Sequence, residues 1–258
     1  SGLVGSEMCI RDRVMINGKL VTEGDLSGPS GHQYVLASSK VEVAILEVAR
    51  GGMIKRGLLP NYAVAATVTN IAYDHIGQNG IESLSDLAEA KGLVYDGLRE
   101  DGTAIINLDD EHICALPIRL RKSYLSTKLS EAEISAYLTP ENFVVFLDGC
   151  DIVLKTTDKR YVLNQIDKIP VTVQGLAKYN YENVLHAVSL CFCLGVEPKK
   201  IGRALAKFGS DAKSNFGRWN YYKSEKHGHL IVDIAHNPAG LVSVLSLIHI
   251  SEPTRPER

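Results

Sequence analysis

The stretch Thr69-Asn70-Ile71-Ala72-Tyr73-Asp74-His75-Ile76-Gly77 decides the fold of this chain. It completes a short apolar run, residues 63–69, of the kind that forms a strand inside a parallel sheet. Ligands of such sheets bind beyond the carboxyl ends of the strands. A cluster of Thr, Asn, Asp and His at a strand end can bind a metal ion or organise phosphate oxygens, and a purely structural histidine is the equal alternative.

Elements of the same kind alternate on both sides of this stretch. Further strands are expected at residues 41–47, 103–106, 221–223 and 229–234. Helices are expected at residues 83–99, where Ser83 and Asp86 form a capping box, and at residues 183–194 and 199–208. Asn237-Pro238 predicts the start of one more helix. The alternation predicts an α/β fold with a mostly parallel sheet.

Two segments have a different, strand-rich pattern. Residues 14–21 read as two short strands around an Asn17-Gly18 turn. Residues 121–173 contain β-rich runs at 143–147, 152–154 and 169–173, with an Asp148-Gly149 turn. The second segment therefore predicts a small antiparallel β section.

Composition restricts the class of protein. The 258 residues include 28 basic and 30 acidic side chains, for a formal net charge of −2. A balance this close to zero argues against binding nucleic acid through bulk charge. No apolar run approaches the roughly 20 residues of a membrane span. The five cysteines form no CxxC pair, which favours reduced thiols in a cytoplasm.

Both ends of the chain lack the periodicity of the rest. Residues 5–13 and 246–258 resemble peptides that arise when sequencing-adapter DNA is translated at the ends of an assembled fragment; ordinary frayed termini are the alternative. We therefore expect residues 1–13 and 246–258 to be non-native tails and leave them out of the fold argument. Residues 14–215 are expected to form one domain and residues 216–245 to begin a second.

Two side chains in unusual positions are candidates for chemistry. Glu47 closes an apolar strand before Ala49-Arg50-Gly51-Gly52, where a carboxylate can hold Mg²⁺ and glycines allow close backbone approach. A solvated or capping glutamate is the commoner reading. Lys91 lies within the apolar stripe of its helix. It either extends along the helix to water or is desolvated, with a lowered pKa.

Several familiar catalytic motifs are absent from the sequence. There is no GxxxxGK[ST] loop, GxGxxG, HExxH or GxSxG, and no paired Cys/His pattern. A hydrolase triad or a dinucleotide oxidoreductase therefore has no support. Asn107-Leu108-Asp109-Asp110 follows the third strand, where helix capping is the default role and binding of ligand hydroxyls the alternative.

Motifs spread along residues 14–245 match one family together. The chain resembles the central domain of the Mur ligase superfamily, most closely its cyanophycin synthetase branch, followed by the start of the family's C-terminal domain. The matching strings are Ile16-Asn17-Gly18, Gly24-Asp25-Leu26-Ser27-Gly28-Pro29, Leu46-Glu47-Val48-Ala49-Arg50-Gly51-Gly52-Met53-Ile54-Lys55-Arg56-Gly57-Leu58, Thr69-Asn70-Ile71 with Asp74-His75-Ile76-Gly77, Ala88-Glu89-Ala90-Lys91, Ile106-Asn107-Leu108-Asp109-Asp110, Gly175 with Asn183-Val184-Leu185-His186-Ala187, Gly217-Arg218-Trp219-Asn220 and Asp233-Ile234-Ala235-His236-Asn237-Pro238-Ala239-Gly240.

The resemblance implies an ATP-dependent amide ligase with Mg²⁺ as cofactor. Such an enzyme phosphorylates a carboxylate to an acyl phosphate, and an amine then displaces the phosphate. Glu47 and His75 match positions that hold Mg²⁺, and Lys91 matches a lysine that is carbamylated in many Mur ligases and supports a second Mg²⁺. The residues expected to bind ATP are Asn70, Asn183 (adenine), Arg218 (phosphate) and Asp233 (ribose).

The cyanophycin branch adds Asp or Arg to a poly-aspartate chain, so the expected partners are ATP, an amino acid and an acidic polymer. Another Mur-type ligase, for peptidoglycan precursors or polyglutamate, and a non-catalytic nucleotide-binding domain are the alternatives. A homo-oligomer is compatible with the sequence, which defines no oligomeric state.

The chain departs from the family pattern in three places. The family's phosphate loop is expected upstream of Val14, most of the amine-binding domain is expected after Gly240, and Asn107-Leu108-Asp109 replaces Asn-Ala-Asp. We therefore expect the isolated chain to lack ligase activity.

Overall fold

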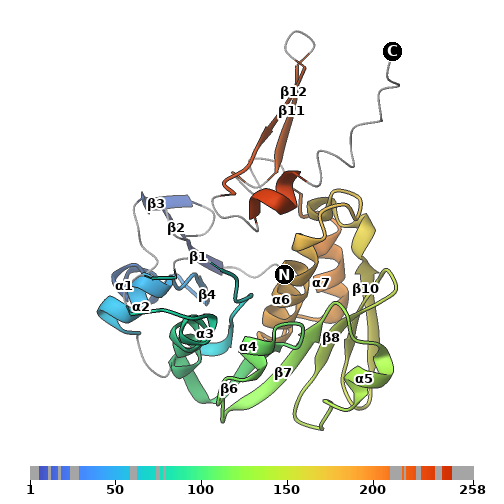
Figure 1. Cartoon of the computed structure of the whole chain (residues 1–258), viewed down its shortest axis with the longest axis horizontal. Coiled ribbons are helices and arrows are strands. Elements are labelled where there is room, and N and C mark those ends of the chain that lie inside the picture. Colours follow the sequence, from blue (N-terminus) through green and yellow to red (C-terminus); the bar gives the residue numbers. More distant parts are fainter. Residues whose placement is uncertain are drawn as a thin grey trace.

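A six-stranded sheet forms the centre of the protein, as described by a computed structural model (Figure 1). The structure describes residues 6–10, 13–16, 19–23, 29–58, 63–73, 76–77, 80–209, 217, 219–224, 228–235 and 240–245. The strands run in the order β10-β9-β8-β7-β6-β5. Their bounds are β5 Ala63–Thr67, β6 Leu98–Asn107, β7 Arg121–Ser126, β8 Val144–Asp148, β9 Asp151–Lys155 and β10 Arg160–Gln165.

The sheet is parallel on one side and antiparallel on the other. Strands β5 to β8 pair in parallel, and β9 and β10 add in antiparallel fashion. This confirms the predicted α/β fold with a mostly parallel sheet and a small antiparallel section. The antiparallel section is smaller than predicted, because β7 joins β6 and β8 in parallel.

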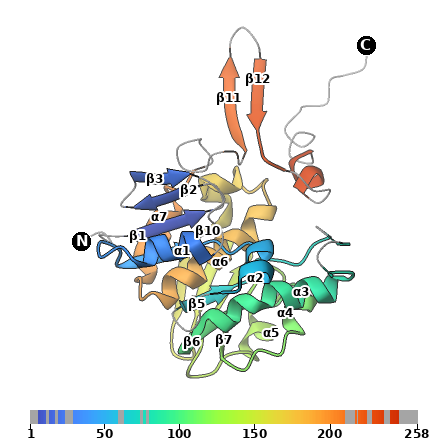
Figure 2. The same cartoon turned by 90° about the vertical axis from the view of Figure 1, so that its left-hand side faces the viewer.

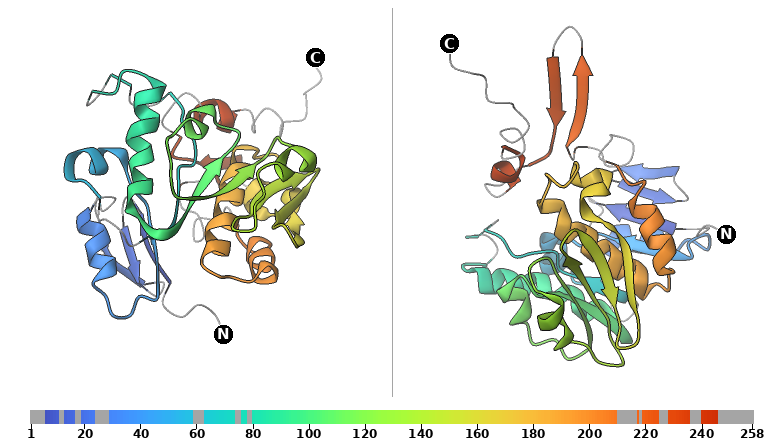
Figure 3. Two further views of the ribbon diagram at one scale, coloured as in Figure 1. Left: turned by 90° about the horizontal axis from the view of Figure 1, so that it is seen from below. Right: turned by 90° about the vertical axis from the view of Figure 1, so that its right-hand side faces the viewer.

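Helices cover both faces of this sheet (Figure 3). Helices α6 (Tyr179–Cys193) and α7 (Pro198–Leu205) pack on one face. Helices α3 (Leu84–Gly92), α4 (Glu111–Cys114) and α5 (Glu131–Ser135) lie on the other. Alternate residues of the buried strands face opposite layers. In β6, for example, Ile105 joins the α6 core while Ala104 and Ile106 join the α3 core.

A second, four-stranded sheet lies beside the first and has the order β3-β2-β1-β4 (Figure 2). Its bounds are β1 Ser6–Ile10, β2 Arg13–Ile16, β3 Lys19–Glu23 and β4 Val43–Leu46. Helices α1 (Pro29–Leu36) and α2 (Arg50–Arg56) accompany it. The two strands predicted within residues 14–21 are confirmed as β2 and β3, while Asn17-Gly18 lies outside the described residues.

Two expectations about this region were wrong. The strand predicted at residues 41–47 was expected in the same sheet as residues 63–69, but β4 pairs in parallel with β1 instead. Residues 5–13 were left out of the fold, yet Ser6–Ile10 pairs with both β2 and β4. Whether these residues are native, and where the domains begin and end, stay predictions.

Three other boundaries differ from prediction. The helix expected to reach residue 99 ends at Gly92, where the 3₁₀-helix η1 (Leu93–Gly97) takes over and Leu98 starts β6. The strand expected at residues 169–173 is absent, since η2 (Ile166–Lys168) and η3 (Pro170–Thr172) occupy this region. Val173 has a left-handed φ of 51°, which ends any extended run.

The C-terminal part forms a separate hairpin. Strands β11 (Asn220–Ser224) and β12 (Gly228–Val232) pair with each other and project away from the six-stranded sheet (Figure 1). Residues 240–245 are helical, and Asn237-Pro238 lies outside the described residues. Every helix in the described part of the chain is too short or too polar to cross a membrane.

Candidate functional site at the end of strand β5

The chain segment that leaves β5 is held by side chains from several elements. Backbone groups of four consecutive residues, 68 to 71, each take part in a hydrogen bond with a side chain. The amide of Val68 donates to Tyr95 Oη at 3.2 Å, and the amide of Ile71 donates to Asp110 Oδ2 at 2.6 Å. The Thr69 carbonyl accepts from His186 Nε2 at 3.1 Å and from Asn107 Nδ2 at 3.2 Å. The Asn70 carbonyl accepts from Lys91 Nζ at 3.0 Å. Residues 68–71 are therefore a fixed, polar end of strand β5.

Lys91 comes to this strand end from helix α3. Ser83 and Asp86 open the helix with the predicted capping box. Lys91 lies in the last turn, half-buried, and its ammonium donates to the carbonyl of Asn70. Two of the predicted site residues, Asn70 and Lys91, therefore lie together. The lowered pKa considered for Lys91 stays a prediction.

His186 was not singled out by sequence reasoning, which treated it as part of a family motif. It is 3% exposed and lies between Thr67 Oγ1, 2.8 Å from Nδ1, and the Thr69 carbonyl. Because a carbonyl oxygen only accepts, Nε2 carries a hydrogen. In the neutral ring Nδ1 then accepts from the Thr67 hydroxyl, which also lies 3.2 Å from the Ile105 carbonyl. Burial lowers the pKa of His186 to about 4, although the bond to Thr69 opposes this shift. The family motif matched by residues 183–187 has a small residue at this position, so the histidine itself was a signal in the sequence.

The segment after β6 contributes helix capping and strand tethering. Asn107 is buried and binds both the Thr69 carbonyl and the Asp109 amide. Asp110 caps α4 through Oδ1 and holds the Ile71 amide through Oδ2. The capping role predicted as the default for this segment is confirmed at Asp110. Asp109 is engaged by Ser126 and Thr127.

Glu182 adds a second unforeseen group near these carboxylates. It projects from α6, and burial, followed by the charge of Asp109, raises its pKa. The side chain of Asn107 donates to it and opposes the shift. Glu182, Asp109 and Asp110 thus place three acidic side chains on this side of the site, with Lys128 as a nearby positive charge.

Glu47 and Arg50 lie at the end of β4, in the other sheet. Glu47 is exposed, and its carbonyl accepts from His32 Nε2 at 3.0 Å. Gly51 and Gly52 lie within the first turn of α2, which Arg50 begins. The Nη1 nitrogen of Arg50 is buried and has no hydrogen-bond partner in the part of the chain that the structure describes. An unsatisfied guanidinium nitrogen is suited to an anionic oxygen of a ligand.

The other predicted residues have different outcomes. Asn183 is exposed on α6, and its amide donates to Asn180 Oδ1 at 3.2 Å. The carboxylate of Asp233 accepts from the amides of Trp219, at 2.9 Å, and Ala235, at 2.8 Å. His75 and Arg218 lie outside the described residues, so the structure does not test them.

The groups in this part of the chain fit ATP and Mg²⁺. Mg²⁺ takes one or two protein carboxylate or carbonyl oxygens and completes its shell with water and phosphate. Glu47 has a carboxylate of this kind at the end of β4, and Arg50 and Lys91 have the positive charge that phosphate oxygens need, so the residue types fit these ligands. Among the described residues, no three Asp, Glu, His or Cys side chains form a cage that would hold an ion alone.

The comparisons with known proteins agree on one family. The model of the Mur ligase middle domain matches residues 17–191. Cyanophycin synthetases from Crocosphaera subtropica and Nostoc sp. are 30% and 31% identical to this chain over 90% of its length, and the chain spans 27% and 26% of those proteins. A UDP-N-acetylmuramoyl-L-alanyl-D-glutamate–2,6-diaminopimelate ligase from Phocaeicola vulgatus is 24% identical over 83% of the chain and 40% of that protein.

Solved structures agree at the level of the fold. MurF from Acinetobacter baumannii superimposes with a TM-score of 0.62 at 18% identity, covering 97% of this chain and 49% of that one. Escherichia coli FolC in complex with DHPP and ADP gives 0.60 at 15% identity, covering 98% and 60%.

Proposed function

Because the chain belongs to the Mur ligase middle-domain family, we propose that it is the nucleotide-binding part of an ATP-dependent ligase that joins a carboxylate to an amine. The chain spans about a quarter of the cyanophycin synthetases it matches, 27% and 26%, so the complete reaction belongs to a longer protein. ATP phosphorylates the carboxylate, the amine attacks the acyl phosphate, and phosphate leaves.

One observation carries this proposal: the ammonium of Lys91 lies 3.0 Å from the carbonyl of Asn70 at the carboxyl end of β5. Phosphoryl transfer depends on positioning and charge neutralisation more than on covalent chemistry by the protein. The fixed carbonyl positions the Lys91 side chain at the end of a parallel strand, where its carbamate, formed with CO₂, would help to hold the Mg²⁺ that neutralises phosphate charge. The bonds to Thr69 and Ile71 keep that carbonyl in place.

We assign the remaining roles from the family motifs. Glu47, His75 and Lys91, the last as its carbamate, hold Mg²⁺, which neutralises phosphate charge when bound. The nucleotide is bound by Asn70, Asn183 at adenine, Asp233 at ribose and Arg218 at phosphate. For Asn183 and Asp233, ATP binding adds contacts to side chains that already make local bonds.

We propose a cyanophycin-synthetase-like substrate: Asp or Arg added to a poly-aspartate chain. Support comes from the Ala49-Arg50-Gly51-Gly52 motif and from identities of 30–31% to cyanophycin synthetases, against 24% to the diaminopimelate ligase. Ligation of peptidoglycan precursors or polyglutamate is the second candidate.

The experiment is a substrate panel on the longer ligase that contains this chain. ATP, Mg²⁺ and a poly-aspartate primer are combined with single amino acids, and product mass and ADP are measured. We expect mass increments of aspartate or arginine with stoichiometric ADP. Turnover only with a muropeptide or folyl acceptor would replace the substrate assignment, and absence of ATP use with every acceptor would reject the ligase assignment.

A further inference from the structure

Strand β10 ends the six-stranded sheet and leaves one edge without a partner strand among the described residues. The Thr156 amide donates to the Lys159 carbonyl at 2.8 Å, which makes these two residues a hydrogen-bonded pair. Hydrogen-bonded and non-bonded pairs alternate in an antiparallel ladder. The register of β9 and β10 therefore turns the N–H and C=O groups of Arg160 and Val162 outward, toward the open edge.

A groove of about 560 Å³ runs between this edge and helix α7. Its lining includes residues 160–164 of the strand, of which Val162 is 52% exposed. The helix crosses the strand at Gly202, whose carbonyl accepts from Asn164 Nδ2 at 3.2 Å. The groove thus offers unpaired strand groups on one wall and a helix on the other.

The charge of the groove has one sign. Its lining includes Arg160, Lys199 and Arg203 and no acidic residue. Lys199 and Arg203 are four residues apart on α7, so they lie on one side of the helix, exposed and without an ion-pair partner in the described part of the chain.

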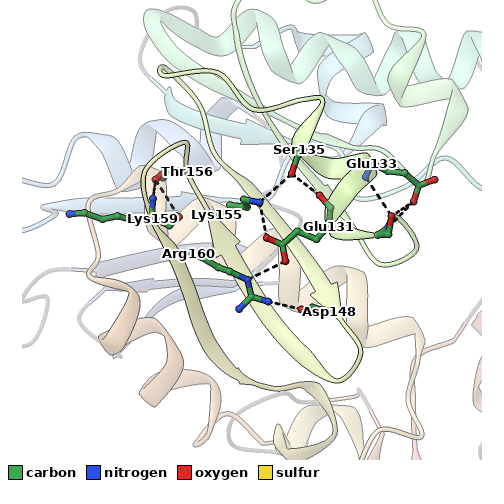
Figure 4. A network of polar contacts seen from close by, with 9 residues as sticks. Glu131, Glu133, Ser135, Asp148, Lys155, Thr156, Lys159 and Arg160 are labelled. Carbon is green, nitrogen blue, oxygen red and sulfur yellow. Dashed lines mark hydrogen bonds and ion pairs between the residues drawn. The ribbon is translucent and has the colours of Figure 1, made fainter.

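Arg160 is already neutralised. Its guanidinium binds Glu131 and Asp148 on the opposite face of the sheet, in the network that also contains Lys155 (Figure 4). The unpaired positive charge of the groove therefore comes from α7.

We propose that this groove binds an extended acidic peptide, which adds to β10 as a further strand and places alternate carboxylates against Lys199 and Arg203. Strand addition supplies main-chain bonds, and side chains on one face of the added strand supply specificity. Basic residues on an edge strand often serve to prevent aggregation. Here the unpaired charges are on the neighbouring helix and face the groove, where they favour an acidic strand.

The acidic polymer of the proposed function is the natural occupant, and in this respect alone the inference rests on that function. A second attachment point away from the reacting end would keep a growing chain on the enzyme between additions, through effective concentration. An acidic segment of another protein is the alternative source of the same chemistry.

The test measures binding to the 258-residue chain without ATP, so it is independent of ligase activity. The probe is a fluorescently labelled aspartate decapeptide, followed by anisotropy at low salt. We expect Lys199→Glu with Arg203→Glu to weaken binding about tenfold or more. The matched control, Lys40→Glu with Arg119→Glu, makes the same change in net charge at exposed sites outside the groove and is expected to change Kd less than about twofold.

A second pair of variants tests strand addition. Val162→Pro removes one outward N–H, which an edge strand tolerates, and Val162→Ala keeps it. We expect only the proline variant to lose affinity, with thermal melting showing that both variants remain folded. Equal loss in both charge-reversal pairs, or no binding at all, would overturn the proposal. So would an oligonucleotide of equal charge that binds as tightly and with the same sensitivity.

Discussion

His186 is the residue on which the strand end depends most. It fixes Thr69 through one ring nitrogen and Thr67 through the other, and the same histidine connects this segment to the helix that carries Asn183. Burial favours the neutral ring, with the hydrogen on Nε2 and with Nδ1 accepting from the Thr67 hydroxyl. One buried histidine therefore joins two residues of this segment to α6.

A pH dependence of stability follows from the pKa of His186. Its folded pKa is about 4 and its unfolded pKa is near 6.5, so below about pH 6.5 the unfolded chain binds more protons. Stability is constant above that pH and falls as pH decreases toward 4, by about 3 kcal/mol from this residue. Urea unfolding of wild type and His186→Gln from pH 7 to pH 4 measures the difference.

The stability advantage of wild type over His186→Gln should shrink across that interval, because the variant cannot titrate there. Other groups, including the buried His32, are common to both proteins and cancel in the comparison. Parallel curves for the two proteins would contradict the assignment of a neutral, buried His186.

Arg50, like His32, has a buried side-chain nitrogen without a hydrogen-bond partner among the described residues. The unsatisfied Nη1 of Arg50 costs stability. Arg50→Met should therefore leave the free energy of unfolding unchanged or raise it by about 1 kcal/mol. In the longer ligase the same change should raise the KM for ATP or for the acidic substrate about tenfold.

The control for Arg50 is Arg99→Met, an exposed arginine in β6. It should affect neither stability nor KM. A destabilised Arg50→Met protein with unchanged KM values would show that Arg50 is structural and not a ligand-binding group.

Sequence reasoning found the site residues that carry motifs and missed those that act only through packing. Asn70 and Lys91 were predicted and lie together. The roles of His186 and Glu182 could not be predicted, because their contacts with the ends of β5 and β6 join residues far apart in the sequence and leave no local pattern.

At the scale of elements, the crossing of α7 over β10 is the tightest contact in the proposed groove. A Cβ atom on Gly202 would meet the carbonyl of Leu163 at less than van der Waals distance. Gly202→Ala should therefore destabilise the chain by about 2 kcal/mol, although alanine is the better helix former. Thermal and urea unfolding measure this cost.

Ala204→Gly in the same helix is the control for this position. It should cost less than about 1 kcal/mol, from helix propensity alone. If Gly202→Ala were as stable as wild type, α7 could not lie against β10 as described, and the groove would lose one wall.

Elements with a strong local sequence signature were predicted well. Elements whose place depends on pairing with a distant strand, or on backbone bends, were not. The Ser83 capping box, the Asp148-Gly149 turn and the β2–β3 hairpin have local sequence signatures, and each is present at the strands or helix expected. The sheet membership of β4 depends on the distant β1, and the apolar run at residues 169–173 fails as a strand because Pro170 and the left-handed Val173 bend it.

At the scale of the whole molecule, the fold agrees with the sequence-based prediction, and we propose that the complete reaction needs a longer protein. The six-stranded sheet with helices on both faces provides the end of β5, and Asp233 follows β12 at the base of the hairpin that projects from the sheet (Figure 1). For the chain alone we expect no phosphate release with ATP, Mg²⁺ and primer. Robust turnover by the 258 residues would contradict that expectation.

The most direct test of the central claim is amino-acid-dependent phosphate release by the longer ligase, compared between wild type, Lys91→Ala and Lys122→Ala. Lys122 is a half-buried lysine near the amino end of β7. The site lies at the other end of the parallel strands, beyond their carboxyl ends. We expect kcat to fall about 100-fold or more in Lys91→Ala and to stay near normal in Lys122→Ala. Wild-type turnover in Lys91→Ala, or an equal loss in both variants, would contradict it.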